Sequence, residues 1–345
     1  MTRKRSGTTS ICGNARAARM PAQIKPMLAT LVDEPFSDSN WIFETKWDGY
    51  RSVCFLKNGQ ARFVSRNQIE MTPQYPELAN IARHVRAKEA ILDGEICALD
   101  ARGIPRFQML QRKGGSERPP IVYFVFDLLY VDGYDLTACT VVERKTKLAE
   151  ILQPSNVIKL SEHIDGEGEA FFREIEKFHL EGMMAKRADS KYVQKRSSDW
   201  LKIKTVMRQE VVIGGYTQPR GGRSHFGSLV CGLYRDDELH YVAHTGGGFN
   251  EKLLASIYKL MQPLKINKSP FVAIPKTNEP VQWLKPKLVA EVKFSEWTAD
   301  NHLRHPVFVG LREDKKPKDC RFEFESDTDV VVKKTKKPGK KKRRV

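Results

Sequence analysis

The amino-acid sequence predicts a two-domain α+β protein, and three observations support this prediction. The chain has 345 residues, whereas folded domains usually contain about 100 to 200. Hydrophobic residues make up 40% and charged residues 29% of the chain, so it can form a sizeable core. The strand and helix pattern changes after residue 205. We therefore expect a first domain over residues 23–205 and a second over 206–325.

Residues 1–22 are predicted to precede the first domain as a basic, disordered extension. The first 20 residues contain five basic side chains and no acidic one. Such a segment is typical of a transit peptide, of a flexible DNA-binding arm, or of a start codon assigned upstream of a true start at Met20. These interpretations stay open at this point.

The first domain is predicted from β-rich runs that alternate with helical patterns. Four short runs are rich in β-branched and aromatic residues, and three segments between or after them have helical periodicity. The runs lie at 41–45, 50–56, 90–99 and 121–130, and the helical patterns lie near 75–87, 142–152 and 168–179. The alternation indicates one α/β or α+β domain.

The second domain is predicted from short strands and Gly-rich turns. After residue 205 the chain reads VVIGGY, GGRSHFGSLVCGLY and ELHYVAHTGGG, followed by a helical pattern near 250–261. Later strands are expected at 289–294 and 306–311. Several short strands with one helix favour a small β-barrel such as an OB-fold, which commonly binds nucleic acid.

The charge distribution predicts a polyanionic partner. The formal net charge is +17, which is typical of proteins that bind nucleic acid or an anionic membrane surface. Residues 333–345 carry nine basic side chains and no acidic one. Together with the basic N-terminus they leave only +3 for residues 21–332, so a DNA-binding surface on the folded body must be local. We expect residues 326–345 to be a disordered basic tail, and we prefer a DNA-binding tail to a nuclear-localisation signal.

The cysteines and the hydropathy pattern indicate an intracellular protein that does not enter a membrane. The six cysteines include no CxxC pair, which argues against a zinc site and a disulfide framework and favours a reducing compartment. No apolar stretch approaches the roughly 18 residues that span a bilayer, and the N-terminus lacks the apolar core of a signal peptide.

The segment Lys46-Trp47-Asp48-Gly49-Tyr50-Arg51 lies between two β-rich runs. A turn containing glycine at this position would project the lysine from a sheet into a cleft. The segment resembles the KxDGxR motif of the covalent nucleotidyltransferases, the superfamily of ATP-dependent DNA ligases, RNA ligases and mRNA capping enzymes.

Other motifs of this superfamily follow in the same order. Gln68 stands where many members have glycine, which puts the turn after the second motif in question. The matching segments are Ser65-Arg66-Asn67, Asp93-Gly94-Glu95, Phe126-Asp127, EGMMAK (181–186), WLKIK (200–204), and Leu303-Arg304-His305-Pro306 through Arg312-Glu313-Asp314-Lys315. Period-2 alternation places Asp93 and Glu95 on one face of a strand. The resemblance covers residues 26–315 and is strongest to the ligase domain of bacterial end-joining DNA ligase D.

The resemblance implies a nucleotidyltransferase (ATP-grasp-like adenylation) domain followed by an OB-fold, and it implies a role for each matched residue. Lys46 would attack the α-phosphate of ATP and carry AMP covalently. Lysine has an ordinary pKa of about 10.4, so burial or nearby cations must remove its proton. The further implied roles are adenine contacts by Glu44 and Phe126, ribose contacts by Arg51, Arg66 and Arg196, phosphate contacts by Lys202 and Lys204, orientation of pyrophosphate by Arg312 and Lys315, and metal binding by Glu95 and Glu181, with Glu95 also part of the nucleotide site.

Oxygen ligands of this kind suit Mg²⁺, or Mn²⁺ in its place. The resemblance further implies nicked or broken double-stranded DNA as substrate, DNA repair by double-strand break joining, and a Ku-type end-binding protein as partner. We expect a monomer in the bacterial cytoplasm, associated with the nucleoid, or a nuclear protein if the source is eukaryotic.

Two rival functions are weighed against this interpretation. An RNA ligase or a capping-type guanylyltransferase would share the motifs, but the runs PMLATL, FETKWDGYR and LRHPVFVGLREDK favour an end-joining DNA ligase. An NAD-dependent ligase is also disfavoured, because those enzymes resemble longer chains with an extra N-terminal domain and a cysteine zinc site, and this sequence has no CxxC pair. A DNA-end-binding protein without catalysis would need neither the lysine nor the carboxylates.

Overall fold

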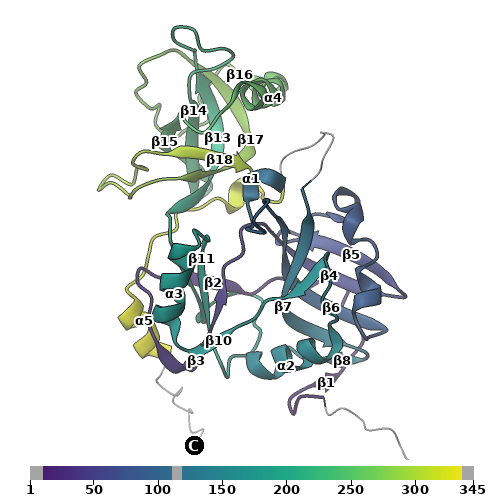
Figure 1. The fold of residues 1–345 in the computed structure, drawn as a ribbon. Helices are drawn as coiled ribbons and strands as arrows, with labels where there is room; N and C mark the ends of the chain where they lie inside the picture. Colours follow the sequence, from purple (N-terminus) through teal and green to yellow (C-terminus); the bar gives the residue numbers. More distant parts are fainter. Residues whose placement is uncertain (1–10, 111–118, 336–345) are drawn as a thin grey trace, which may run out of the picture. The chain divides into compact units, whose positions relative to one another are not determined.

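The computed structural model describes residues 11–110 and 119–335, which form two compact units (Figure 1). Within the described residues, the first unit comprises 11–105, 119–203 and 326–335, and the second comprises 106–110 and 204–325. The chain therefore changes unit close to the predicted boundary at residue 205. It also crosses between the units near residues 105, 119 and 325. The sequence predicts the boundary at residue 325, but it indicates neither the two earlier crossings nor the return to the first unit after residue 325.

The first sheet of the first unit is mostly antiparallel. Its strand order is β1-β8-β7-β6-β4-β5, and β9 pairs with β7 in parallel. Its long central strands, β6 and β7, are buried along most of their length, which explains their nearly continuous apolar sequences. The bounds are β1 (Arg16–Ala17), β4 (Tyr50–Lys57), β5 (Gln60–Ser65), β6 (Glu89–Ala98), β7 (Ile121–Val131), β8 (Tyr134–Asp135) and β9 (Ile158–Leu160).

The second sheet of the first unit carries the KxDGxR segment at the end of one strand. Its order is β10-β3-β11-β12-β2, with β12 and β2 parallel. The bounds are β2 (Leu28–Leu31), β3 (Asp38–Thr45), β10 (Ile164–Gly166), β11 (Gly182–Arg187) and β12 (Arg196–Lys204). Ile42 and Trp200 of this sheet pack with Val53 and Ile91 of the first sheet, so one core lies between the two sheets.

Two longer helices of this unit lie close to the predicted positions. Helix α2 (Val141–Ile151) begins at a capping box in which Thr140 and Glu143 satisfy each other's backbone N–H groups. Helix α3 (Gly168–Lys177) buries Phe172 against Trp41 and Phe43 on the outer face of the second sheet. Among the described residues, no helix has both the length and the apolar character needed to cross a membrane.

The helix predicted near residues 75–87 is replaced by short 3₁₀ turns. The turns are η1 (Thr72–Gln74), η2 (Pro76–Leu78) and η3 (Ile81–His84). Pro73 and Pro76 lack the backbone N–H that an α-helix interior requires. The apolar spacing that suggested a helix still buries Leu78 and Ile81.

Parts of the predicted N-terminal extension and C-terminal tail are structured. Strand β1, within residues 11–22, pairs with β8. Helix α5 (Thr328–Thr335) packs on the first unit through Val332, and Thr328 donates to Asp33 at 2.8 Å. The lysine-rich composition obscured these few apolar and capping residues. The rest of both predicted segments, residues 1–10 and 336–345, lies outside the described residues.

A disulfide joins Cys12 to Cys139, contrary to the sequence prediction of no disulfide. The two cysteines are separated by 127 positions, with Cα atoms 6.2 Å apart. Spacing rules detect local cysteine patterns, whereas tertiary folding brings the N-terminal segment to the residue before the N-cap of α2. The other four cysteines are free and buried.

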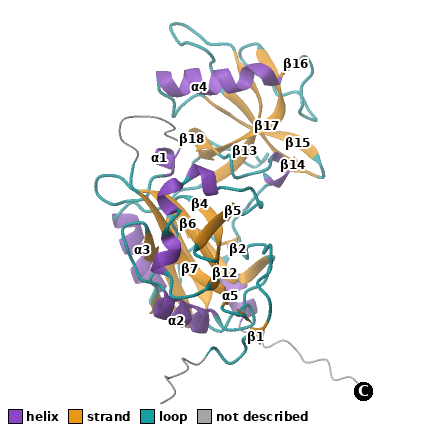
Figure 2. Cartoon of the chain, turned by 90° about the vertical axis from the view of Figure 1, so that its right-hand side faces the viewer, coloured by secondary structure: helices purple, strands orange, loops and turns teal. Residues whose placement is uncertain are grey.

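The second unit is built on one antiparallel sheet with the order β15-β14-β13-β17-β16, and β18 pairs with β17. Helix α4 packs on it through Leu254, Ile257 and Met261 (Figure 2). Among the described residues no ladder joins β15 to β16, so the barrel is partly open, as OB-folds are. The bounds are β13 (Arg208–Thr217), β14 (Leu229–Arg235), β15 (Glu238–Thr245), β16 (Lys265–Ile266), β17 (Val281–Lys293), β18 (Val307–Leu311), α1 (Phe107–Leu110), α4 (Glu251–Met261), η4 (Gln262–Leu264) and η5 (Pro317–Asp319).

A buried ion pair between β7 and α2 is expected to stabilise the first unit. Arg144 donates to both oxygens of Asp127 at 2.7 and 2.8 Å, and both side chains are fully buried. Asp127→Asn would leave a buried guanidinium without its counter-charge, so we expect a loss of about 3 to 5 kcal/mol in the free energy of unfolding. Urea unfolding measures this loss. The exposed Lys147–Glu150 pair supplies the control, because Glu150→Gln should cost about 0.5 kcal/mol or less, and equal effects of the two substitutions would contradict the prediction.

Candidate active site

Lys46 directly follows β3, beside the residue that precedes β11. The Lys46 backbone N–H donates to the Gly182 carbonyl oxygen at 2.9 Å, which extends the β3–β11 pairing by one residue. The Lys46 ammonium group is hydrogen-bonded and ion-paired to Glu181. Gly49 completes the turn, because a Cβ atom there would clash with the Ile96 carbonyl oxygen. The sequence-predicted lysine and one predicted metal ligand are therefore in direct contact.

The electrostatic environment keeps Lys46 protonated when no ligand is bound. Burial lowers the pKa of the Lys46 amine, but the carboxylates of Glu181, Glu95 and Asp48 together prevail and raise the pKa above its ordinary value. Burial thus acts on the pKa of Lys46 in the direction that the sequence analysis predicts, but the carboxylates outweigh it when no ligand is bound. The other expected route, neutralisation of the carboxylates by a cation, remains compatible with the site.

Glu95 and Glu181 are suited to holding a divalent cation. Both carboxylates act electrostatically on the ammonium group of Lys46, although Glu95 lies on β6 and Glu181 precedes β11. No group of three or more His, Cys, Asp or Glu side chains with metal-binding geometry occurs in the described parts of the chain. Two carboxylates fit Mg²⁺, which usually takes one or two protein carboxylates and completes its shell with water and substrate phosphates.

Arg51 is held by a buried carboxylate. On β4, its guanidinium donates to both oxygens of Asp93 at 3.0 and 2.6 Å, and Asp93 also accepts from the Tyr192 hydroxyl at 2.7 Å. Asp93 and Glu95 both act on Arg51 and raise its pKa against the opposing effect of burial. Tyr192 carries no motif signal in the sequence, because it lies 99 positions from Asp93 and no motif spacing links the two residues.

Phe126 owes its position to a β-bulge. In the β6–β7 ladder, Asp93 is opposite Asp127 and Gly94 is opposite Val125, which leaves Phe126 as the extra residue. Bulges redirect side chains and often occur beside active sites. The Phe126 ring lies edge-on to Trp200, and the Arg51 guanidinium carbon is 5.3 Å from its centroid. Phe126 is thus partly exposed rather than a simple core residue.

Glu44 is buried between two lysines. It is 1% exposed, and it accepts from Lys186 at 2.9 and 3.0 Å and pairs with Lys145 at 2.9 Å. Burial lowers the pKa of Lys186, Lys145 lowers it further, and Glu44 partly opposes both. Lys186 lies in the EGMMAK segment, whereas Lys145 belongs to α2 and has no motif signal. The expected adenine contact of Glu44 would involve a carboxylate that already has two cationic partners.

Of the remaining predicted residues of the first unit, Arg66 and Arg196 lie at strand ends and Lys202 lies within a strand. Arg66 follows β5 in a turn where Gln68 adopts a φ of 61°, so glutamine takes the left-handed conformation that glycine usually provides. Arg196 is the first residue of β12, and its guanidinium donates to the Ala29 carbonyl oxygen of β2. Lys202 lies further along β12, opposite Leu31 of β2.

Lys204, Arg312 and Lys315 belong to the second unit, where carboxylates surround them. Arg312 donates to both oxygens of Asp314 at 2.8 and 2.9 Å and to Glu291 at 2.9 Å. Lys315 pairs with Glu210 at 2.8 Å. Lys204 donates to the Arg208 carbonyl oxygen at 2.8 Å and lies 3.9 Å from Glu323. The Asp314, Glu291 and Glu210 carboxylates raise the pKa of Arg312 although burial opposes them.

Known proteins are similar to this chain over most of its length. A family model described as "ATP dependent DNA ligase domain" matches residues 26–204, and one described as "ATP dependent DNA ligase C terminal region" matches residues 222–315. The chain is 37% identical over 306 residues to the multifunctional non-homologous end joining protein LigD of Pseudomonas aeruginosa, covering 86% of this chain and 36% of that protein. It is 37% identical over 308 residues to LigD of Mycolicibacterium smegmatis, covering 88% of this chain and 40% of the relative.

A solved structure of mycobacterial DNA ligase D complexed with ATP and MES is also similar. It superimposes with a TM-score of 0.63 at 34% identity, covering 86% of this chain and 97% of that one. The chain spans about two fifths of the length of the two LigD relatives, 36% and 40%.

Glu181→Gln is expected to lower the pKa of Lys46, because the Glu181 carboxylate contributes the largest raising effect. In the wild type, where the folded pKa is raised, the pair stabilises the fold below the unfolded pKa of lysine. This stabilisation is lost as the pH rises through the folded pKa. NMR titration of the lysine ¹³Cε resonance, assigned with Lys46→Arg, measures the shift. Glu89→Gln removes a carboxylate paired with the exposed Lys57 and is the control, and an unchanged Lys46 pKa in Glu181→Gln would contradict the assignment.

Proposed function

The chain belongs to the ATP-dependent DNA ligase family, and on that premise we propose that it joins 5′-phosphate and 3′-hydroxyl ends in double-stranded DNA. The observation that carries the proposal is the position of Lys46 within the matched ligase domain, in contact with Glu181 and under the charge of Glu95. A protein that only binds DNA ends requires no half-buried lysine among carboxylates.

In the first step, the Lys46 amine attacks the α-phosphate of ATP. A phosphorus–nitrogen bond forms, the bond to the β-phosphate oxygen breaks, and pyrophosphate leaves. A divalent cation held by Glu95 and Glu181 would neutralise their charge and the charge of the phosphate oxygens. Removal of the carboxylate charge lowers the pKa of Lys46, so its proton can leave before the attack. The site thus couples nucleotide and metal binding to formation of the nucleophile.

The later steps transfer and then release AMP. The 5′-phosphate of the broken strand attacks the Lys46-linked AMP, which regenerates the free amine and forms a DNA-adenylate. The 3′-hydroxyl then attacks the activated 5′-phosphate, a phosphodiester forms, and AMP leaves. Three reactions therefore use one nucleotide and leave the lysine unchanged at the end.

The nucleotide-binding roles remain proposals for individual side chains. Phe126, redirected by the bulge, offers an aromatic face for the adenine. Arg51, whose orientation Asp93 fixes, is proposed to contact the ribose, as are Arg66 and Arg196. Lys202 is proposed to contact the phosphates. For Glu44, the buried pairing supports an electrostatic role next to the adenine site at least as well as a direct contact.

We further propose that the reaction serves double-strand break repair. The names of the LigD relatives refer to non-homologous end joining, and this supports the biological assignment and a Ku-type partner. A monomer acting at the bacterial nucleoid accords with this role. The rival RNA ligase and guanylyltransferase functions predict GTP use or RNA joining, so comparison of ATP with GTP and of nicked DNA with nicked RNA separates them.

Lys46→Ala is expected to abolish transfer of label from α-labelled ATP to the protein, because the substitution removes the nucleophile. Denaturing electrophoresis after incubation with Mg²⁺ or Mn²⁺ detects the labelled band, and nicked DNA should discharge it into sealed product in the wild type. Pretreatment of the wild type with pyrophosphate removes any AMP already bound. Lys57→Gln, which changes an exposed lysine at the end of β4, should retain a labelled band. Labelling of Lys46→Ala would refute the assignment.

Arg312→Ala is expected to slow lysyl-AMP formation more than the later joining steps, because pyrophosphate is present only in the first step. The expected decrease in the adenylation rate is about tenfold to a thousandfold, the range for loss of one charged phosphate contact. Single-turnover sealing of nicked DNA by pre-adenylated protein measures the later steps separately. Arg235→Ala, at the end of β14, is the matched control. Equal slowing of both stages by Arg312→Ala would contradict the proposed role.

A further inference from the structure

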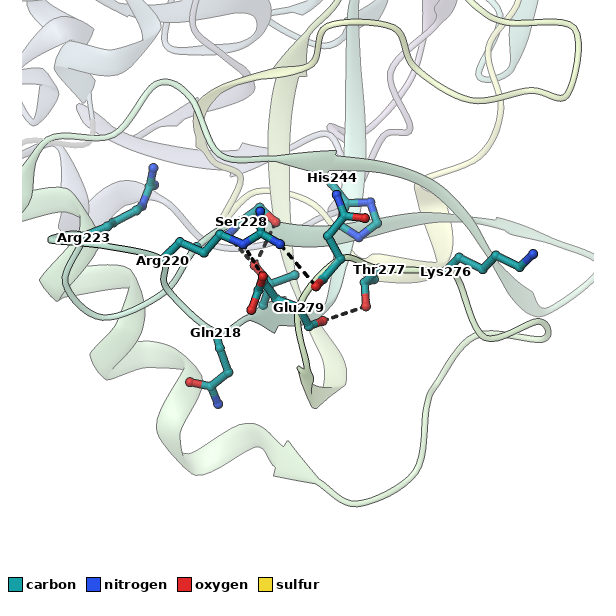
Figure 3. A pocket seen from close by; sticks show the side chains of 11 residues that line it. Gln218, Arg220, Arg223, Ser228, His244, Lys276, Thr277 and Glu279 are labelled. Carbon is teal, nitrogen blue, oxygen red and sulfur yellow. Dashed lines mark hydrogen bonds and ion pairs between the residues drawn. The ribbon is translucent and has the colours of Figure 1, made fainter.

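A polar cavity lies in the second unit, which does not carry Lys46. Its volume is about 460 Å³. The cavity is formed by the turn between β13 and β14, by β15, and by the segment that precedes β17 (Figure 3). The lining residues are Thr217, Gln218, Arg220, Arg223, Gly227, Ser228, His244, Lys276, Thr277, Asn278 and Glu279.

The cavity has an excess of positive charge. Glu279 is the one carboxylate among the lining residues, and it is paired with Arg220. Arg223 and Lys276 also line the cavity, and neither has an ion pair with any residue in the described ranges. Figure 3 shows the Arg220–Glu279 pair between them. Two cations therefore remain uncompensated on a body whose overall charge is nearly balanced.

Two buried nitrogen atoms of the lining residues lack hydrogen-bond partners. The Nη2 atom of Arg223 and the Nε2 atom of His244 are buried without a hydrogen-bond partner among the described residues. The Arg223 Nε–H donates to the Phe226 carbonyl oxygen at 2.9 Å, which fixes the guanidinium while leaving Nη2 unsatisfied. An unsatisfied buried donor costs about 1 to 3 kcal/mol, so an acceptor that enters the cavity gains binding energy.

His244 is hydrogen-bonded to a neighbouring tyrosine. Burial raises the pKa of the Tyr241 hydroxyl, which therefore keeps its proton, and this hydroxyl shares a hydrogen bond with Nδ1 of His244 in which the donor depends on the His244 tautomer. Burial, with a further effect of His302, lowers the pKa of His244, so the ring is neutral at physiological pH. One nitrogen of a neutral ring donates and the other accepts. His244 is thus a neutral polar group with one unpartnered nitrogen beside two cations.

We propose that this cavity binds a phosphodiester group of duplex DNA. Uncompensated cations and the unsatisfied N–H donor of Arg223 together suit a tetrahedral oxyanion. The choice of a DNA phosphate rests on the ligase function proposed above, whereas free phosphate offers the same chemistry from another source. Contacts with the DNA backbone strengthen binding to any sequence and release counterions.

The test compares DNA affinity at several salt concentrations. Fluorescence anisotropy of a labelled nicked duplex is measured with the full chain, with Lys276→Gln, and with the Arg223→Gln/Lys276→Gln double variant. Lys268→Gln is the matched control, because Lys268 is an exposed lysine of the same inter-strand segment that does not line the cavity. We expect the salt slope to fall by about one in the single variant and about two in the double variant. At about 0.1 M salt the affinity of the double variant should fall about tenfold.

Affinities and salt slopes equal to those of Lys268→Gln would overturn the proposal. Arg223 packs on Phe226 and Phe249, so circular dichroism checks the fold of the double variant. Lys276 is exposed, so Lys276→Gln is expected to leave the fold unchanged. The single variant therefore tests the cavity even if the double variant does not fold. Calorimetric titration with inorganic phosphate addresses the other source: phosphate binding that the double variant loses, with DNA affinity unchanged, would also overturn the DNA assignment.

Formation of lysyl-AMP without DNA distinguishes this proposal from the ligase function. All these variants should form the labelled adenylate at the wild-type rate, because none of the substituted residues belongs to the Lys46 site. If the wild type forms no adenylate even after pretreatment with pyrophosphate, the ligase function fails. The anisotropy comparison still decides whether the cavity binds DNA.

Discussion

The ion pair between Lys46 and Glu181 is the interaction on which the proposed chemistry of the first unit depends. An ammonium group has no lone pair for attack, and the surrounding carboxylates raise the pKa of Lys46 and so stabilise its proton. The same carboxylates are proposed to hold a divalent cation, whose charge would reverse their effect on the amine. Strand pairing between β3 and β11 fixes the positions of Lys46 and Glu181, because it brings the end of β3 beside the start of β11.

Three further buried charge groups hold the strands around this pair. Asp93 orients Arg51, Asp127 holds Arg144, and Glu44 lies between two lysines. Burying any one of these charges alone would cost several kcal/mol, and each becomes tolerable only through a partner with good geometry. These pairs connect both sheets and α2, so the electrostatics of the active site and the packing of the unit are inseparable. A change that loosens one is expected to disturb the other.

The second unit shows two contrasting arrangements of basic residues. Arg312 and Lys315 are compensated by Asp314, Glu291 and Glu210, so they become available to a phosphate only by exchanging partners. Arg223 and Lys276 face a cavity without such compensation. Net charge alone cannot distinguish these cases. The near-balanced body therefore combines neutralised cations with a local positive site, in agreement with the charge distribution along the chain.

The sequence by itself determined the order of the motifs, and with it the family and the two-unit organisation, and it singled out Lys46 and Glu181 as candidate site residues. These features depend on residue identity within short motifs, which a sequence states directly. The contact between Lys46 and Glu181 joins residues 135 positions apart, and only the tertiary structure decided it. Only the tertiary structure decided that Tyr192 and Asp93 share Arg51, that Lys145 compensates Glu44, and that a bulge redirects Phe126. It also decided the Cys12–Cys139 disulfide and the return of α5 to the first unit. The reason is physical: these features arise from contacts between residues far apart in the chain, and neither periodicity nor composition specifies which distant partners meet.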